Sequence, residues 1–110
     1  MFIIGGTIMY VVYGYVELYL PYCSSLKEKR KIIHGLISRV RKRFNVSTSE
    51  VEFHDLWQRS GVGFSAVSHY SPGLELITNS IKETFLNYSP DAEMTLFNYD
   101  IISCPYSHYM

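Results

Sequence analysis

Positive charge is concentrated in one short segment of the chain. Residues 26–44 carry eight lysines and arginines and a single acid, Glu28, which gives the segment a net charge of +7. The other residues carry two cations and nine acids, a net charge of −7, so the chain as a whole is formally neutral. A local excess of cations attracts phosphate groups even where the overall charge does not. This segment is therefore the first candidate for a binding surface.

The same segment has the pattern of an amphipathic helix. Ser25 and Glu28 form an S-x-x-E capping box, which predicts a helix from there to about Phe44. At about 100° per residue, one arc of this helix is apolar and contains Leu26, Ile33, Leu36, Ile37, Val40 and Phe44. The opposite arc contains the candidate nucleic-acid-binding residues Lys27, Arg30, Lys31, His34, Arg41 and Lys42. Three further cations flank the apolar arc, namely Lys29, Arg39 and Arg43.

An exposed row of cations can bind a nucleic-acid backbone, and added salt weakens such binding. Arginine can hold a phosphate through two parallel N–H groups, whereas lysine acts as a point charge. The alternative is an ordinary solvated helix face, although such a face usually mixes both signs of charge. An acidic surface on another protein, or on a second copy of this chain, would satisfy the same cations.

Three tyrosines form a second candidate surface. Strict alternation from Tyr10 to Leu20 predicts a strand with an apolar face that includes Val12, Val16 and Leu18. The other face carries Tyr13, Tyr15 and Tyr19. Aromatic residues on an open sheet face stack bases in RNA-recognition domains. However, the strand predicted at 61–69 turns only Gly63, Ser65 and Val67 to that face. We therefore expect the three tyrosines to form a homodimer interface rather than a base-stacking surface.

The segment HDLWQR contains one candidate catalytic pair. His54 and Asp55 could act as a general base and its orienting carboxylate, but no Ser or Cys nucleophile accompanies them in a motif. Ordinary turn chemistry is the alternative, with Asp55 bonding to the backbone and Trp57 covering the edge of the core. We expect the second, and so no enzymatic activity.

Composition gives no reason to expect a metal, a cofactor or a membrane span. The histidines share no ligand spacing and no C-x-x-C motif occurs, while glycine-rich phosphate loops are absent. Two cysteines, Cys23 and Cys104, do not form a disulfide framework, and we expect both to be reduced in the cytoplasm. The uncharged segment 1–16 lacks the basic region of a signal peptide and is short for a membrane helix.

The remaining elements complete a recognisable order. We expect strands at 46–53, 61–69 and 93–103, and a second helix with Ser71 as its N-cap and Pro72 at its first position. The order β-α-β-β-α-β predicts a ferredoxin-like α+β sandwich, in which two helices cover one face of a four-stranded antiparallel sheet. We expect one domain over 1–110, with residues 1–8 as a lead-in and 104–110 as a loose tail. Cys23 and Cys104 should then lie near opposite ends of the first strand, too far apart for a disulfide.

Three spaced motifs carry a family resemblance. They are S-L-K-E-K-R at 25–30, R-F-N-V-S at 43–47 and D-x-W-Q at 55–58. Together they resemble the YlxP-like family of small bacterial proteins over roughly Met9 to Ile102, and the lead-in and tail look unusual for it. The resemblance implies a ferredoxin-like fold. It also implies a link to ribosomes or RNA, because members often lie in gene clusters with translation initiation and ribosome-maturation factors. The family has no settled activity, so no catalytic residue can be carried over.

Charge pattern and resemblance lead to one functional expectation and one alternative. We expect an accessory factor that binds ribosomal RNA or a ribosomal subunit through the basic side of the first helix. The alternative is a non-catalytic assembly module that forms a homodimer through the open sheet face or an edge strand.

Overall fold

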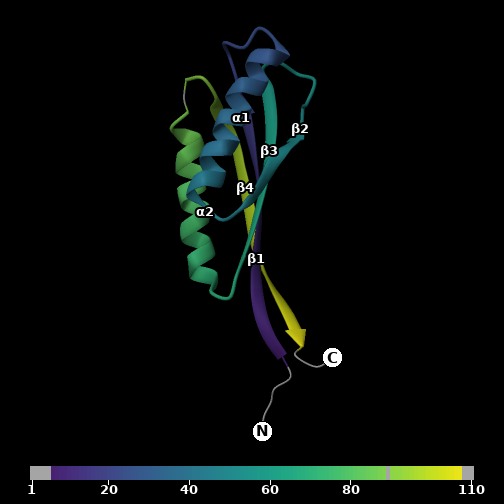
Figure 1. Cartoon of the computed structure of the whole chain (residues 1–110), viewed down its shortest axis with the longest axis vertical. Helices are drawn as coiled ribbons and strands as arrows, with labels where there is room; N and C mark the ends of the chain where they lie inside the picture. The colour runs from purple at the N-terminus through teal and green to yellow at the C-terminus, as the bar shows by residue number, and fades with distance from the viewer. Residues whose placement is uncertain (1–5, 89, 108–110) are drawn as a thin grey trace.

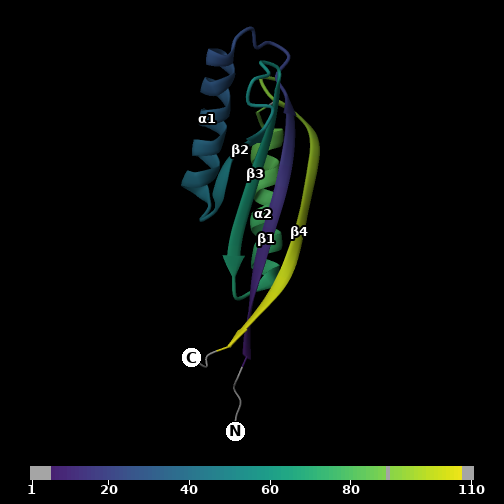
Figure 2. The same cartoon turned by 90° about the vertical axis from the view of Figure 1, so that its right-hand side faces the viewer.

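The computed structural model describes residues 6–88 and 90–107 and has the expected order of elements (Figure 1). The elements are β1 (Gly6–Tyr19), α1 (Leu26–Arg43), β2 (Ser47–Glu52), β3 (Arg59–Ser68), α2 (Ser71–Leu86) and β4 (Glu93–Ser107). The strands form one sheet in the order β2-β3-β1-β4, and every neighbouring pair is antiparallel. Both helices lie on the same face of this sheet (Figures 1 and 2). The predicted ferredoxin-like sandwich is confirmed.

The core lies between the helices and the sheet face that alternation predicts. Val12, Val16 and Leu18 of β1 are fully buried, and Val62 and Phe64 of β3 lie beside them. The helices contribute Ile33, Leu36, Ile37, Val40, Leu74, Ile81 and Phe85 to the same cluster. The opposite face of the sheet carries no helix, and we call it the open face (Figure 2).

Helix α1 begins after the predicted N-cap, although the Glu28 carboxylate accepts the N–H of Ser24 rather than that of Ser25. Helix α2 begins one residue earlier than predicted. Ser25 is the N-cap of α1, and its Oγ accepts the N–H of Glu28 at 3.1 Å. The N-cap of α2 is Tyr70, one residue before the predicted Ser71, so Ser71 is already helical. No side chain caps this end, although the Oγ of Ser68 accepts the N–H of Tyr70 at 3.0 Å.

The expected lead-in and loose tail are wrong where the structure describes them. β1 begins at Gly6 and β4 continues to Ser107, and the two strands pair from Gly6 opposite Ser107 onward. Residues 1–5 and 108–110 of these two expected segments lie outside the described residues. Pro105 lies within β4, although proline cannot donate to a sheet ladder. It is tolerated here because β4 is an edge strand.

The two long strands give the molecule an elongated shape. β3 ends at Ser68, opposite Tyr10, so β1 and β4 alone form a two-stranded ribbon beyond that point. We call residues 6–9 and 104–107 the ribbon; it projects past both helices (Figures 1 and 2). The molecule measures 63 × 24 × 22 Å, and its radius of gyration of 16.9 Å exceeds the roughly 13 Å of a compact domain of this length.

Gly14 and Gly35 should respond oppositely to alanine. A Cβ on Gly14 would lie 2.2 Å from Cζ of the buried Phe64, whereas one on Gly35 would meet only the Tyr88 hydroxyl, at 3.4 Å. We expect Gly14→Ala to destabilise the fold by about 1–3 kcal/mol through overpacking. Gly35→Ala should stabilise it by about 0.5–1 kcal/mol, because Gly35 lies inside α1. Urea unfolding of both variants measures this difference, and equal stabilities would contradict the packing of Phe64 over Gly14.

Candidate nucleic-acid interface

Helix α1 is oriented by its apolar side, which turns the predicted cationic side to solvent. Ile33, Leu36 and Val40 pack into the core. The six predicted nucleic-acid-binding residues are all exposed, and we call them the basic face: Lys27, Arg30, Lys31, His34, Arg41 and Lys42. Within the described residues, none of these six forms an ion pair with an acid, because the two ion pairs involve Lys29 and Arg59 instead. The structure therefore brings the predicted residues together on one uncompensated surface.

Arg41 also fixes the edge of the basic face to the sheet. Its guanidinium donates to the carbonyl of Thr48 on β2 at 2.6 Å. A hollow of about 190 Å³ lies between α1 and β2, and its lining includes Arg30, His34 and Arg41. Three basic side chains around one recess suit an anion, since arginine can direct paired N–H groups at phosphate oxygens. Glu50 also borders this hollow, but its carboxylate is neutralised by Lys29.

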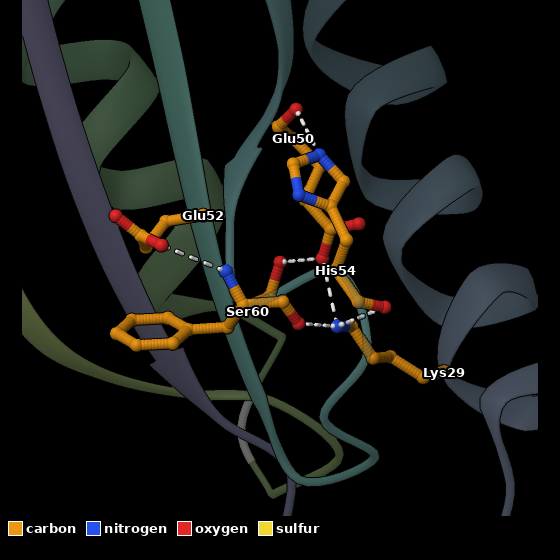
Figure 3. Close-up of polar contacts among 6 residues, drawn as sticks. Lys29, Glu50, Glu52, His54 and Ser60 are labelled. Carbon is orange, nitrogen blue, oxygen red and sulfur yellow. Dashed lines mark hydrogen bonds and ion pairs between the residues drawn. The ribbon is translucent and has the colours of Figure 1, made fainter.

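Lys29 has a different role from the exposed cations of the same helix. Its side chain is only 1% exposed, and its Nζ lies 3.0 Å from Oε2 of Glu50. The same ammonium group donates to the carbonyl of Phe53, and the hydroxyl of Ser60 donates to Glu50 at 2.6 Å (Figure 3). A buried charge is tolerated only when it is paired and hydrogen-bonded. Lys29 is thus a structural cation that ties α1 to the end of β2.

The Lys29 contacts also hold an unusual backbone conformation. Phe53 has a φ of 61°, the one positive value among described residues other than glycine. Its carbonyl accepts both the Lys29 ammonium and the N–H of Leu56, the latter at 3.1 Å. The left-handed region costs free energy for a bulky residue and persists only when its surroundings enforce it. Sequence reasoning missed this role because Lys29 was placed only by its helical angle. The available signal was Glu50, a carboxylate at a strand position opposite the buried Val62.

The segment HDLWQR forms the turn between β2 and β3, and it does not assemble the predicted catalytic pair. The ring of His54 donates to the carbonyl of Glu50 at 3.1 Å rather than to Asp55. The turn is closed by a hydrogen bond from the Leu56 N–H to the carbonyl of Phe53, not by the expected hydrogen bond of the Asp55 carboxylate. Trp57 is 52% exposed, so the expectation that it covers the core edge is wrong. It lines an open hollow of about 490 Å³ at the end of the sheet.

The open face presents two of the three predicted tyrosines to solvent. Tyr13 and Tyr19 are exposed, whereas Tyr15 is half-buried and its hydroxyl donates to Glu17 at 2.9 Å. Tyr13 lies opposite Ser65, and Tyr15 lies opposite Gly63, as the alternation of β3 predicts. This part of β3 therefore places no aromatic ring beside them on the open face.

Glu17 and Tyr15 form a hydrogen-bonded pair whose pKa values are shifted in opposite directions. The Arg59 guanidinium and the Tyr15 hydroxyl, in that order, lower the pKa of Glu17. Burial, followed by the hydrogen bond to Glu17, raises the pKa of Tyr15 to about 12. The folded protein thus keeps the Tyr15 proton between about pH 10 and 12, where the unfolded chain loses it. This contribution to stability is complete below pH 10 and is lost as the pH rises through 12.

In an ultraviolet titration of the folded protein, we expect one tyrosine to ionise near pH 12. The Tyr15→Phe variant should lack this late ionisation step. Glu17→Gln should shift the step to lower pH, because it removes the negative charge that opposes ionisation of Tyr15. A step near pH 12 that survives in Tyr15→Phe would show that another group causes it. Circular dichroism at each pH confirms that the protein remains folded during the titration.

Neither thiol is placed for disulfide formation, and the described residues contain no cluster of metal ligands. Cys104 lies opposite Met9 near one end of β1, while Cys23 follows the other end, so the predicted separation is confirmed. Burial raises the pKa of the Cys23 thiol, which keeps it protonated. Groups of three or more His, Cys, Asp or Glu side chains suited to a metal are not found in 6–88 and 90–107. In the same ranges, neither helix is long and apolar enough to cross a membrane.

These features define a small ferredoxin-like domain with one cationic helix on its surface. The chain belongs to the family described as "Protein of unknown function (DUF503)", whose model matches residues 11–99. It is 38% identical over 72 residues to the "Uncharacterized protein YlxP" of Bacillus subtilis (strain 168), covering 66% of this chain and 77% of that protein. The resemblance to the YlxP-like family is confirmed.

Two solved structures match this chain at low sequence identity. The de novo designed protein Foldit4 is 10% identical, with a TM-score of 0.49 over 87% of this chain and 96% of that one. Protein SO0527 from Shewanella oneidensis is 14% identical, with a TM-score of 0.46 over 92% of this chain and 98% of that one.

Proposed function

We propose that this protein is a non-catalytic accessory factor that binds RNA backbone, on ribosomal RNA or a ribosomal subunit, through the basic face of α1. One observation carries the proposal. The cations of the basic face are exposed and have no acidic partner within the described residues, whereas Lys29 and Arg59 form the ion pairs. When exposed, unpaired cations of this kind bind a phosphate backbone, the counterions condensed on the nucleic acid are released, which favours binding. The proposal places the protein in the cytoplasm, where such RNA is found.

The arrangement supports backbone recognition rather than base recognition. Lys27, Lys31 and Lys42 can act as point charges along the helix, while Arg30 and His34 border the hollow beside β2. Contacts of this type position a protein on a nucleic acid but carry no sequence information. We therefore expect similar affinities for RNAs of equal length and different sequence.

The test is direct binding of a fluorescently labelled fragment of ribosomal RNA at low salt. The wild-type protein should bind, and neutralising Lys27, Lys31 and Lys42 should weaken binding strongly. If both proteins fail to bind at low salt, the proposal is wrong for these RNAs. Equal binding by both proteins would place the RNA contact elsewhere on the molecule. In either case an acidic surface of another protein becomes the better candidate for the binding partner of the basic face.

A further inference from the structure

The open face and the ribbon form one continuous surface that is largely apolar. Met9, Val11 and Tyr13 project from β1 on the open side, as the register with β3 and β4 requires. Val67 of β3 lies opposite Val11, and Ile102 of β4 lies on its other side. We call these five residues the open-face patch. Val67 is 67% exposed and Tyr13 is 53% exposed, so large apolar side chains remain in contact with water.

Charges are sparse on this patch. Glu17, Glu52 and Arg59 lie toward the other end of the open face, beside the turn between β2 and β3, and Arg59 is paired with Glu17. Asp100 is opposite Tyr13, but it lies on the edge strand β4, where its carboxylate can remain hydrated. No unpaired cation is available on the described open face to hold a phosphate. The chemistry of this surface therefore differs from that of the basic face.

The ribbon needs a covering partner more than the rest of the sheet does. Beyond Tyr10, no helix and no third strand of the described residues lies beside these two strands (Figure 2). Ile8 is 47% exposed on the helix side of the ribbon, and Met9 is 39% exposed on the open side. An isolated two-stranded ribbon is marginally stable in water and gains stability when another layer packs against it. The whole ribbon lies outside residues 11–99, which the family model matches.

We infer that a second copy of this chain covers the open-face patch and the ribbon, forming a two-fold sheet-on-sheet dimer. The open-face patch and the ribbon carry no charged side chain, and Asp100 beside them lies on the edge strand. This part of the face can therefore meet a copy of itself with little like-charge repulsion, as a two-fold interface requires. β1 spans 14 residues, or about 46 Å at 3.3 Å per residue, and strands are spaced about 4.8 Å apart. β2, β3 and β4 add 6, 10 and 15 residues, so the whole open face, including the end that carries Glu17 and Arg59, covers on the order of 700 Å². This is close to the roughly 800 Å² per partner of a stable interface.

The open face also has a hollow between large side chains, into which side chains of a second sheet can pack. A hollow of about 290 Å³ lies between β1 and β4, bordered by Tyr13, Tyr15 and Asn98. Small residues flank the tyrosines on β3, since Ser65 lies opposite Tyr13 and Gly63 lies opposite Tyr15. Two sheets pack with interdigitating side chains about 10 Å apart. The dimer would direct both α1 helices outward, because the helices cover the other face of each sheet, so two basic faces would be available at once.

The test is the mass of the full-length protein in solution without RNA, measured by light scattering and sedimentation velocity at micromolar concentrations. The wild type should be a dimer. Val67→Lys should raise the dissociation constant of the dimer at least about a hundredfold, because each dimer would bury two unpaired ammonium groups. Leu76→Lys is the matched control, since Leu76 is 69% exposed on α2, outside the proposed interface, and this variant should remain dimeric.

Three outcomes would overturn the inference. They are a monomeric wild type at tens of micromolar, a Val67→Lys protein that dimerises like the wild type, and a Leu76→Lys protein that dissociates equally. If Val67→Lys fails to fold by circular dichroism, Val51→Lys on β2 replaces it, because Val51 is 51% exposed on the same face. A monomer that sediments with phosphatidylcholine vesicles would assign the patch to a lipid surface and would also contradict the inference. These measurements do not involve RNA. If they contradict the dimer, the proposed RNA binding is unaffected and is tested separately.

Discussion

Replacing Lys29 by alanine is expected to destabilise the protein by about 3–5 kcal/mol, the largest effect of any single substitution of a cation in this chain. Lys29 is 1% exposed, and its ammonium lies 3.0 Å from Glu50. Without it, the Glu50 carboxylate would remain largely buried, and Ser60 would be its one side-chain hydrogen-bond donor among the described residues. The carbonyl of Phe53 would lose its ammonium donor as well, and the left-handed turn would be less firmly held.

The measurement is urea unfolding of the wild type, Lys29→Ala and a matched control, Lys31→Ala. Lys31 is two residues away on the same helix but is exposed, so its loss should change the free energy of unfolding by less than about 0.5 kcal/mol. Similar small effects for both variants would contradict the buried position of Lys29.

A double-mutant cycle would separate the ion pair from simple packing. Lys29→Met and Glu50→Gln should each destabilise the protein, but together they should cost clearly less than the sum, because no buried charge is left unpaired. The glutamine carbonyl can still accept the hydrogen bond from Ser60. Additive losses would show that the two side chains act independently.

Neutralising three lysines of the basic face is expected to weaken RNA binding on the order of a hundredfold at 0.1 M salt. The variant Lys27→Gln/Lys31→Gln/Lys42→Gln removes three potential phosphate contacts, and each contact contributes about 0.7–0.9 to the slope of log affinity against log salt. All three side chains are exposed and unpaired with acids in the described structure, so their replacement should leave the fold intact.

The matched control places the same change in net charge on the other helix. Leu76→Glu/Asn79→Glu/Lys82→Gln also lowers the net charge by three, at exposed positions of α2. If local phosphate contacts dominate, this control should bind RNA nearly as tightly as the wild type. If both triple variants lose the same affinity, net charge alone would explain the binding, and α1 would have no special role.

The fold could be predicted because its signals are local. Alternation in β1 and β3, the capping box at Ser25 and the 3–4 spacing of apolar residues each act within a few residues. The basic face followed from the same helical periodicity, because burial of one side of α1 forces the other side into solvent.

The wrong predictions concern residues whose burial or pairing depends on residues far away in the sequence. Lys29 is buried because Glu50, 21 residues later, faces it across the layer between helix and sheet. The ribbon forms because β4 pairs with the start of β1, including residues that we expected to be a lead-in. Pro105 of β4 is accommodated because β4 is an edge strand. Trp57 was expected to cover the edge of the core, but it is 52% exposed and lines an open hollow at the end of the sheet.

The central claim is that the basic face binds RNA backbone, and the most direct test is the salt dependence of that binding. Affinity for one labelled ribosomal RNA fragment would be measured by fluorescence anisotropy from 50 to 300 mM salt, for the wild type and the Lys27→Gln/Lys31→Gln/Lys42→Gln variant. We predict a straight line of negative slope for the wild type, and a slope shallower by about 2–3 for the variant. A wild-type affinity that is absent at 50 mM salt, or two identical slopes, would contradict the claim.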